Sequence, residues 1–153
     1  DRLGVLAPND VEARFEILNE TYVKKLQIEA RIIGDMCLNH VIPAAVKYQN
    51  ILIENVNGIR EIFGKGYLEF CGSEIETLKK ISTYINNVSA DVEGLVEARK
   101  KANRIEAIAE RAKVYSHEVK DMMEKVRMSA DNLEMLIDDE MWPLPKYREL
   151  LFF

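Results

Sequence analysis

The residues of this chain with the widest chemical range are its few histidines and cysteines. Cys37 and His40 stand three residues apart, and Asp35 lies two residues before Cys37. All three are zinc-ligand types, but side chains at positions i and i+2 of a helix point apart, and no fourth ligand lies nearby in the sequence. We therefore expect His40 to lie at a helix interface with its ring satisfied, and we predict no metal ligand.

Two other motifs that bind metal or phosphate are present only in part. A di-iron helical bundle needs a glutamate three residues before a histidine, but Cys37 precedes His40 and Val114 precedes His117. The Gly-Lys-Gly at 64–66 follows a helical pattern and lacks the Gly-Lys-Ser/Thr that opens the helix after a phosphate loop. The sequence thus predicts no catalytic, cofactor-binding or metal-binding residue of its own.

The composition favours a soluble domain. The 153 residues are 48% hydrophobic and 31% charged, with a formal net charge of -5. This acidic balance argues against nucleic acid as a partner, and no apolar run approaches the roughly 18 residues of a membrane span. Two cysteines are too few for a disulfide framework. Because the first residue is not Met, we expect a piece of a longer protein, and the composition is that of a cytosolic domain.

The candidate residues named above lie in segments whose apolar residues repeat with helical periodicity. This periodicity is clearest over 105–136. Asn103 and Glu106 have the spacing of a capping box and predict where this helix starts. Two heptad positions form an apolar seam in which only Ser129 is polar. They are Ile105, Ala112, Val119, Val126 and Leu133, and then Ile108, Tyr115, Met122, Ser129 and Leu136.

A second apolar seam lies before the helix over 105–136. Ser73 and Glu76 have the spacing of a capping box and predict where the helix with this second seam starts. Its members are Leu78, Ile81, Ile85, Val88, Val92 and Leu95. Together the two seams predict a helical hairpin over 73–141, broken near 101–105. The glycines between 64 and 72 predict a loop before it.

Residues 10–63 predict a long kinked helix or a pair of helices. Pro43 lies in the middle, where a proline removes one backbone donor and clashes with the preceding turn. The predicted apolar face contains Phe15, Leu18, Tyr22, Leu26, Ile33, Met36, Ala45, Tyr48, Leu52, Val56, Ile59 and Phe63.

A polar cluster surrounds this proline. It consists of Asp35, Asn39, His40 and Gln49. These side chains either satisfy the carbonyl that Pro43 leaves free, or mark a contact with another subunit or domain. The expected fold is all-α: an antiparallel bundle of long helices, one kinked near Pro43, with a short extended C-terminal tail.

The tail, 142–153, predicts an interaction surface. Pro143 and Pro145 stop the helix and stiffen an extended segment, which lowers the entropy lost on docking. Its apolar anchors are Trp142, Leu144, Tyr147, Leu150 and Leu151. We expect docking on the chain's own bundle around Trp142, with a neighbouring subunit as the alternative surface. With Pro43 and His40, these residues form the predicted interaction set.

Three stretches resemble a known family. They are KKLQIEARIIGDMCLNHVIPAAVKYQNILIENVNGIREIFG (24–64), VEARKKANRIE (96–106) and DDEMWPLPKYRELLFF (138–153). Over nearly the whole chain, in order and spacing, they are similar to the C-terminal region of type III glutamine synthetases, the large form typified by Bacteroides-like bacteria.

The resemblance implies a parent enzyme that joins ammonia to glutamate through a γ-glutamyl phosphate, using ATP and Mg²⁺ or Mn²⁺. It implies a cytoplasmic homo-oligomer, a dodecamer, in which this region packs on the upstream catalytic domain and neighbouring subunits. None of the family's catalytic signatures occurs here, so the chain alone is expected to be inactive. Two alternatives stay open: a free-standing helical adaptor with no enzymatic parent, and a small regulatory ligand site between the helices.

Overall fold

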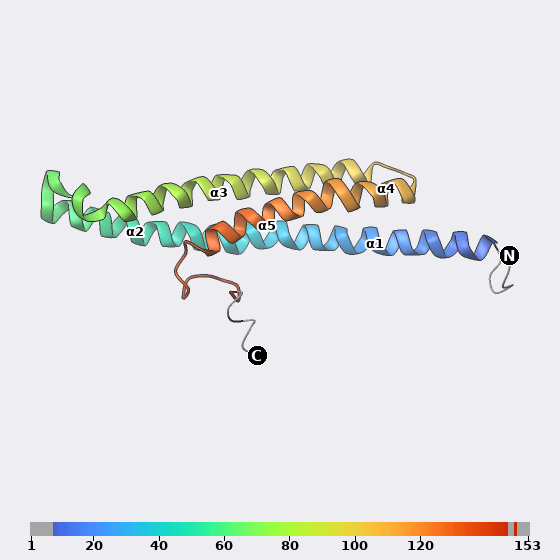
Figure 1. The fold of residues 1–153 in the computed structure, drawn as a ribbon, viewed down its shortest axis with the longest axis horizontal. Coiled ribbons are helices and arrows are strands. Elements are labelled where there is room, and N and C mark those ends of the chain that lie inside the picture. Colours follow the sequence, from blue (N-terminus) through green and yellow to red (C-terminus); the bar gives the residue numbers. More distant parts are fainter. Residues whose placement is uncertain (1–7, 147–148, 150–153) are drawn as a thin grey trace.

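The computed structural model describes residues 8–146 and residue 149 (Figure 1). Its elements, in order, are α1 (Pro8–Met36), the π-helical turn η1 (Cys37–Val41), α2 (Ile42–Phe63), the 3₁₀ turn η2 (Gly64–Gly66), α3 (Leu68–Asn103), α4 (Ile108–Val114), the π-helical turn η3 (Tyr115–Val119) and α5 (Lys120–Glu134). The predicted all-α fold is confirmed, and no strand occurs among the described residues.

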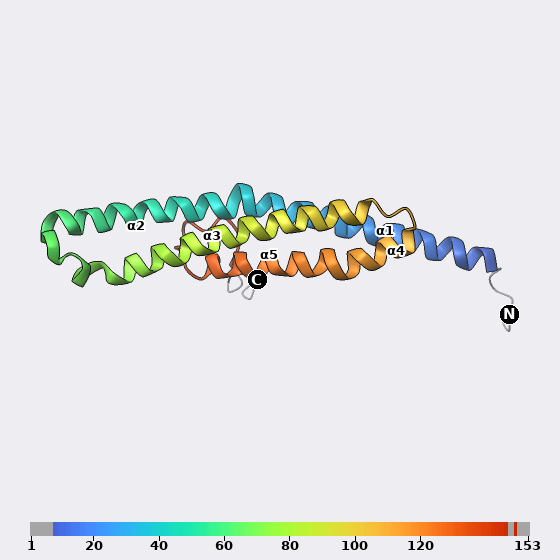
Figure 2. The ribbon, with the colours of Figure 1, turned by 90° about the horizontal axis from the view of Figure 1, so that it is seen from above.

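The helices form an elongated bundle. In Figures 1 and 2, α1 and α2 run along the whole molecule, α3 runs back beside them, and α4 and α5 reverse again along the central part. The α1–α2 run, α3 and the α4–α5 run therefore lie side by side only in the middle of the molecule. At one end α2 and α3 extend as a pair, and at the other end α1 projects beyond α4.

The two predicted seams form the core. Ala112, Val119, Val126 and Leu133 are buried on one side, and Ile81, Val88, Val92 and Leu95 on the other. Ser129, the one polar residue of the first seam, forms a hydrogen bond between helices. Its hydroxyl donates to Asp91 Oδ2 over 2.6 Å and so joins α5 to α3.

The helix around Pro43 is continuous, so of the two predicted alternatives the structure shows one long helix and not a pair. The N–H of Ile42 donates to the carbonyl of Cys37, five residues back. This i→i+5 bond widens one turn just ahead of Pro43, where the ordinary ladder lacks a donor. The irregularity thus takes the form of the π turn η1.

Both predicted caps are wrong. Asn103 is the last residue of α3, and α4 begins only at Ile108 with no side-chain cap. Ser73 lies inside α3, where its hydroxyl donates to Glu74. In both places the polar side chain has found a partner other than the backbone N–H groups of a helix start.

The connection after α2 is shorter than the loop predicted over 64–72. Gly64 ends α2 with φ of 57°, a conformation that favours glycine, and α3 already starts at Leu68. The helix is irregular once more at Cys71 (φ −130°, ψ 26°). The rings of Phe63 and Phe70 stack with centroids 4.1 Å apart and close this end of the hairpin.

The predicted face of α1 is partly wrong. Leu26 is buried, but Phe15, Leu18 and Tyr22 are exposed. All three residues lie in the first half of α1, whose start projects beyond α4 in Figures 1 and 2.

Candidate functional site

The C-terminal segment turns back onto the bundle directly after α5. The N–H groups of Met141 and Trp142 both donate to the carbonyl of Asp138, at 3.1 and 3.0 Å. This turn brings Trp142 into the core, where only 8% of the residue is exposed. Leu144 is half-buried against the same core, and Pro143 and Pro145 are exposed.

Lys146 fastens this segment to the end of α5. Its Nζ donates to the carbonyls of Glu134 and Ile137, at 3.0 and 3.1 Å, and pairs with Asp139 Oδ1 at 2.6 Å. The last carbonyls of a helix have no partner within the helix, so a lysine ammonium group is well placed there. Sequence reasoning missed Lys146, because nothing near it in the sequence shows that it reaches back to residue 134.

The structure brings the predicted tail and the proline region together. Trp142 and Leu144 border the same cavity as Cys37 and Val41 of η1. The predicted tail residues Tyr147, Leu150 and Leu151 lie outside the described part of the chain, so their docking stays a prediction.

The polar cluster predicted around Pro43 does not form one site. Asn39 Nδ2 donates to Asp35 Oδ1 at 2.6 Å, one turn away on the same helix. Gln49 instead reaches α3, where its Nε2 donates to Ser82 Oγ at 2.8 Å. The group therefore splits into a local contact and an interhelical one.

His40 is exposed, so its expected place at a helix interface is wrong. Cys37 and Val41 occupy the buried positions of η1, which leaves His40 on the outer side. Burial also raises the pKa of the Cys37 thiol to about 11, which disfavours the thiolate that zinc binds. Among the described residues, no group of three or more His, Cys, Asp or Glu side chains is placed to hold a metal ion.

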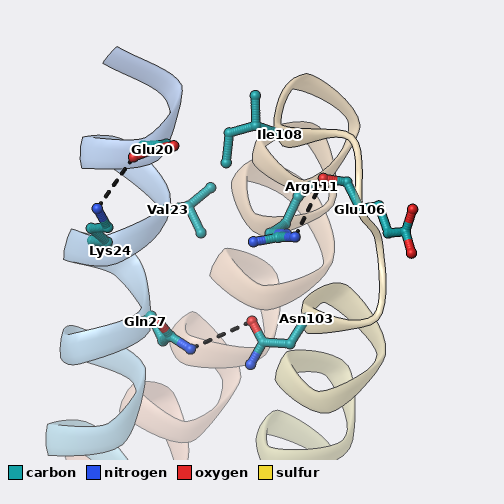
Figure 3. A pocket seen from close by; sticks show the side chains of 8 residues that line it. All are labelled: Glu20, Val23, Lys24, Gln27, Asn103, Glu106, Ile108 and Arg111. Carbon is teal, nitrogen blue, oxygen red and sulfur yellow. Dashed lines mark hydrogen bonds and ion pairs between the residues drawn. The ribbon is translucent and has the colours of Figure 1, made fainter. Parts of the chain in front are cut away.

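A polar pocket of about 520 Å³ lies at the other end of the bundle, between α1, the end of α3 and α4 (Figure 3). Asn103 stands at its base. Its Oδ1 accepts hydrogen bonds from Gln27 Nε2 at 3.4 Å and from the buried Tyr115 hydroxyl at 2.7 Å. Burial raises the pKa of Tyr115, so this hydroxyl stays protonated and remains a donor.

Arg111 forms the opposite wall of this pocket. Its Nε donates to the carbonyl of Ile105 at 2.7 Å, and its Nη2 donates to the carbonyl of Glu106 at 3.4 Å (Figure 3 draws the second bond). Both bonds hold the α3–α4 link in place. The other charged residues of the lining are Glu106 and an exposed ion pair between Lys24 and Glu20, 3.3 Å apart. The pocket has no nucleophile beside a base, so we interpret it as a joint that ties α1 to the α3–α4 link.

None of the helices in the described part of the chain is long and apolar enough to cross a membrane.

Comparison with known proteins gives a consistent result. Residues 1–60 match the family profile of the glutamine synthetase C-terminal domain. The chain is 44% identical over 144 residues to a glutamine synthetase of Bacteroides fragilis (strain YCH46), which covers 94% of the chain and 20% of that protein. It is 30% identical over 165 residues to a type-3 glutamine synthetase of Dictyostelium discoideum, covering 97% of the chain and 20% of that protein. The chain thus spans about a fifth of the length of these relatives.

Proposed function

We propose a structural role for this chain, on the premise that it belongs to the glutamine synthetase C-terminal domains, in their type III form. The observation that carries the proposal is the 44% identity across 94% of the chain. A free-standing adaptor is not favoured, because the similarity to enzymes of this family extends over nearly all of the chain.

The activity we propose for the parent protein is the ATP-dependent ligation of ammonia to glutamate in the cytoplasm, as part of nitrogen metabolism. The described residues do not fit the divalent metal of that reaction, since no three-ligand group is placed among them. We therefore assign ATP and Mg²⁺ or Mn²⁺ to the upstream catalytic domain and derive no catalytic step through this chain. The chain alone is expected to show no glutamine formation.

The role we propose for the domain itself is packing against the catalytic domain and against neighbouring subunits of a homo-oligomer, a dodecamer. The projecting end of α1 supports this proposal, because Phe15 and Leu18 are 56% and 68% exposed there. Large apolar side chains gathered on one exposed helix end are typical of contact surfaces. The hairpin tip offers a second such surface, with Ile62 77% exposed.

The test compares the parent enzyme with a Leu18→Ser variant by sizing chromatography and by glutamine formation. Leu18 is 68% exposed, so we expect a smaller assembly and reduced activity from a domain that still folds. Met128→Ser is the matched control, because Met128 is 65% exposed on α5, away from the α1 end. Full assembly and activity after both Leu18→Ser and deletion of the whole domain would exclude a role in assembly.

A further inference from the structure

The polar pocket between α1, the end of α3 and α4 has the dimensions of a small-molecule site. Its volume of about 520 Å³ lies within the usual range for such sites. Val23 and Ile108 give it apolar surface, and Gln27 and Asn103 place amide groups at its base (Figure 3). The lining therefore suits an occupant with a short apolar body and a polar group.

Arg111 is the charged anchor of this pocket. Its bonds to the carbonyls of Ile105 and Glu106 use two of its five N–H groups and hold the guanidinium in place. The other three N–H groups have no acceptor among the described residues. In Figure 3 one terminal nitrogen bonds to Glu106, and the other points across the pocket toward α1. A guanidinium that is already held in place, with donors to spare, suits a carboxylate.

The charges on the lining favour an anion at Arg111. Glu20 and Lys24 pair with each other at 3.3 Å, so together they add no net charge. The carboxylate of Glu106 lies on the outer side of the α3–α4 link in Figure 3, turned away from Arg111. The positive charge of Arg111 is therefore left for an occupant of the pocket.

Two further arginines strengthen the positive potential at the base of the pocket. Burial raises the pKa of Tyr115, and the charges of Arg99, Arg111 and Arg31 oppose this rise, so all three cations lie near its hydroxyl. The same hydroxyl donates to Asn103 at the pocket base. None of the three arginines forms an ion pair within the described part of the chain. An anion that enters the pocket is thus attracted by all three.

We propose that this pocket binds a small carboxylate, whose carboxylate oxygens accept hydrogen bonds from Arg111 and whose carbon skeleton lies against Val23 and Ile108. The occupant contacts α1 and α4 together, so it strengthens the joint between them. This proposal goes beyond the assembly role and does not depend on it.

The experiment uses the full 153-residue chain with ¹⁵N-labelled glutamine side chains, and the probes are benzoate and benzamide. The chain has two glutamines. Gln27 lines the pocket, and Gln49 lies about 33 Å further along the same helical run, at about 1.5 Å per residue. We expect benzoate to shift the Gln27 amide signals in a saturable way and to leave those of Gln49 unchanged. Benzamide has the same shape without the charge, so it should bind about tenfold more weakly.

Variants of the arginines complete the test. Arg111→Gln removes the anchor and should abolish saturable benzoate binding, whereas Arg60→Gln, at an exposed position of α2, should leave it unchanged. If Arg111→Gln does not fold, the double variant Arg31→Gln and Arg99→Gln keeps the pocket lining and lowers the positive potential. Benzoate should then bind about threefold more weakly at low salt, and benzamide equally well.

Several outcomes overturn the proposal. These are the absence of a saturable change in the Gln27 signals up to the solubility of benzoate, equal affinity of benzoate and benzamide, and unchanged benzoate binding in folded Arg111→Gln. In the intact parent enzyme, ligand-detected NMR should show benzoate binding that Arg111→Gln removes. Its absence there also overturns the proposal, because another part of the parent then covers the pocket. None of these results bears on Leu18 or on assembly, so the two proposals fail separately.

Discussion

At the scale of single residues, Val119 and Lys120 are neighbours with opposite surroundings. Val119 is fully buried in the seam, and Lys120 is exposed. We expect Val119→Asp to destabilise the domain by about 3 kcal/mol or more, because it buries an unpaired charge, and Lys120→Asp to change stability by less than about 0.5 kcal/mol. Thermal unfolding followed by circular dichroism measures both. Equal melting temperatures would show that the helix has a different register.

Lys146 offers a second test at this scale. Its side chain is 13% exposed and satisfies two carbonyls, that of the last residue of α5 and that of Ile137 just after it. We expect Lys146→Met to lower the free energy of unfolding by about 1–2 kcal/mol, because it leaves these acceptors without the ammonium group. Urea denaturation measures the change, with the exposed Lys125→Met as the control. A loss of the same size in both variants would mean that Lys146 does no more than a surface lysine.

Cys37 makes stability depend on alkaline pH. Burial raises the pKa of its thiol from 9.0 to about 11, so the folded state holds the proton more tightly than the unfolded state. The resulting stabilisation is complete below pH 9 and is lost as the pH rises through about 11. We expect unfolding free energies of the unmodified chain to fall more steeply over this interval than those of Cys37→Ala. Parallel pH profiles would contradict the assignment.

At the scale of elements, η1 and Pro43 depend on each other. Pro43→Ala restores a backbone N–H that can donate to the carbonyl of Asn39, as in an ordinary α-helix. Removing an interior proline is worth up to about 3 kcal/mol. Closing the π turn, however, rotates Cys37 and Val41 away from their buried positions, which offsets the gain.

We therefore expect Pro43→Ala to show equal or higher helical content in far-ultraviolet circular dichroism, with a small net change in melting temperature. Asn50→Ala, at an exposed position of α2, serves as the control. Reduced helical content in Pro43→Ala would show that the proline does not shape η1.

The elements also show which features the sequence could predict. The seams through Val119 and Val92 follow from heptad spacing, because periodic burial is a local property of the chain. The caps could not be assigned in this way, since Asn103 forms its hydrogen bonds with Gln27 and Tyr115, which lie far away in sequence.

The candidate site divides along the same line. The burial of Trp142 was expected from its size and from the prolines beside it. The π turns left no sequence signal apart from Pro43, and the exposure of Phe15 depends on how far α4 reaches along α1. That length is set by the tertiary structure, so a single segment of sequence does not reveal it.

At the scale of the whole molecule, the C-terminal segment closes the bundle. Deleting 142–153 removes a buried Trp142, worth roughly 1.5–3 kcal/mol, together with the Lys146 contacts. We expect the melting temperature of the chain to fall by about 5–10 °C, and assembly of the parent enzyme to be impaired. Calorimetry and sizing chromatography measure the two effects. Unchanged melting and an unchanged assembly would mean that the segment contributes to neither.

The unbroken course of α1, η1 and α2 also determines how far one chain can reach. At 1.5 Å per residue, the run from Pro8 to Phe63 measures about 84 Å, more than twice the width of a typical small domain. A rod of this length can touch two surfaces that do not touch each other. Because helix alone joins the two ends of this rod, a displacement at one of those surfaces can be transmitted to the other, and η1 is the place where the rod can bend.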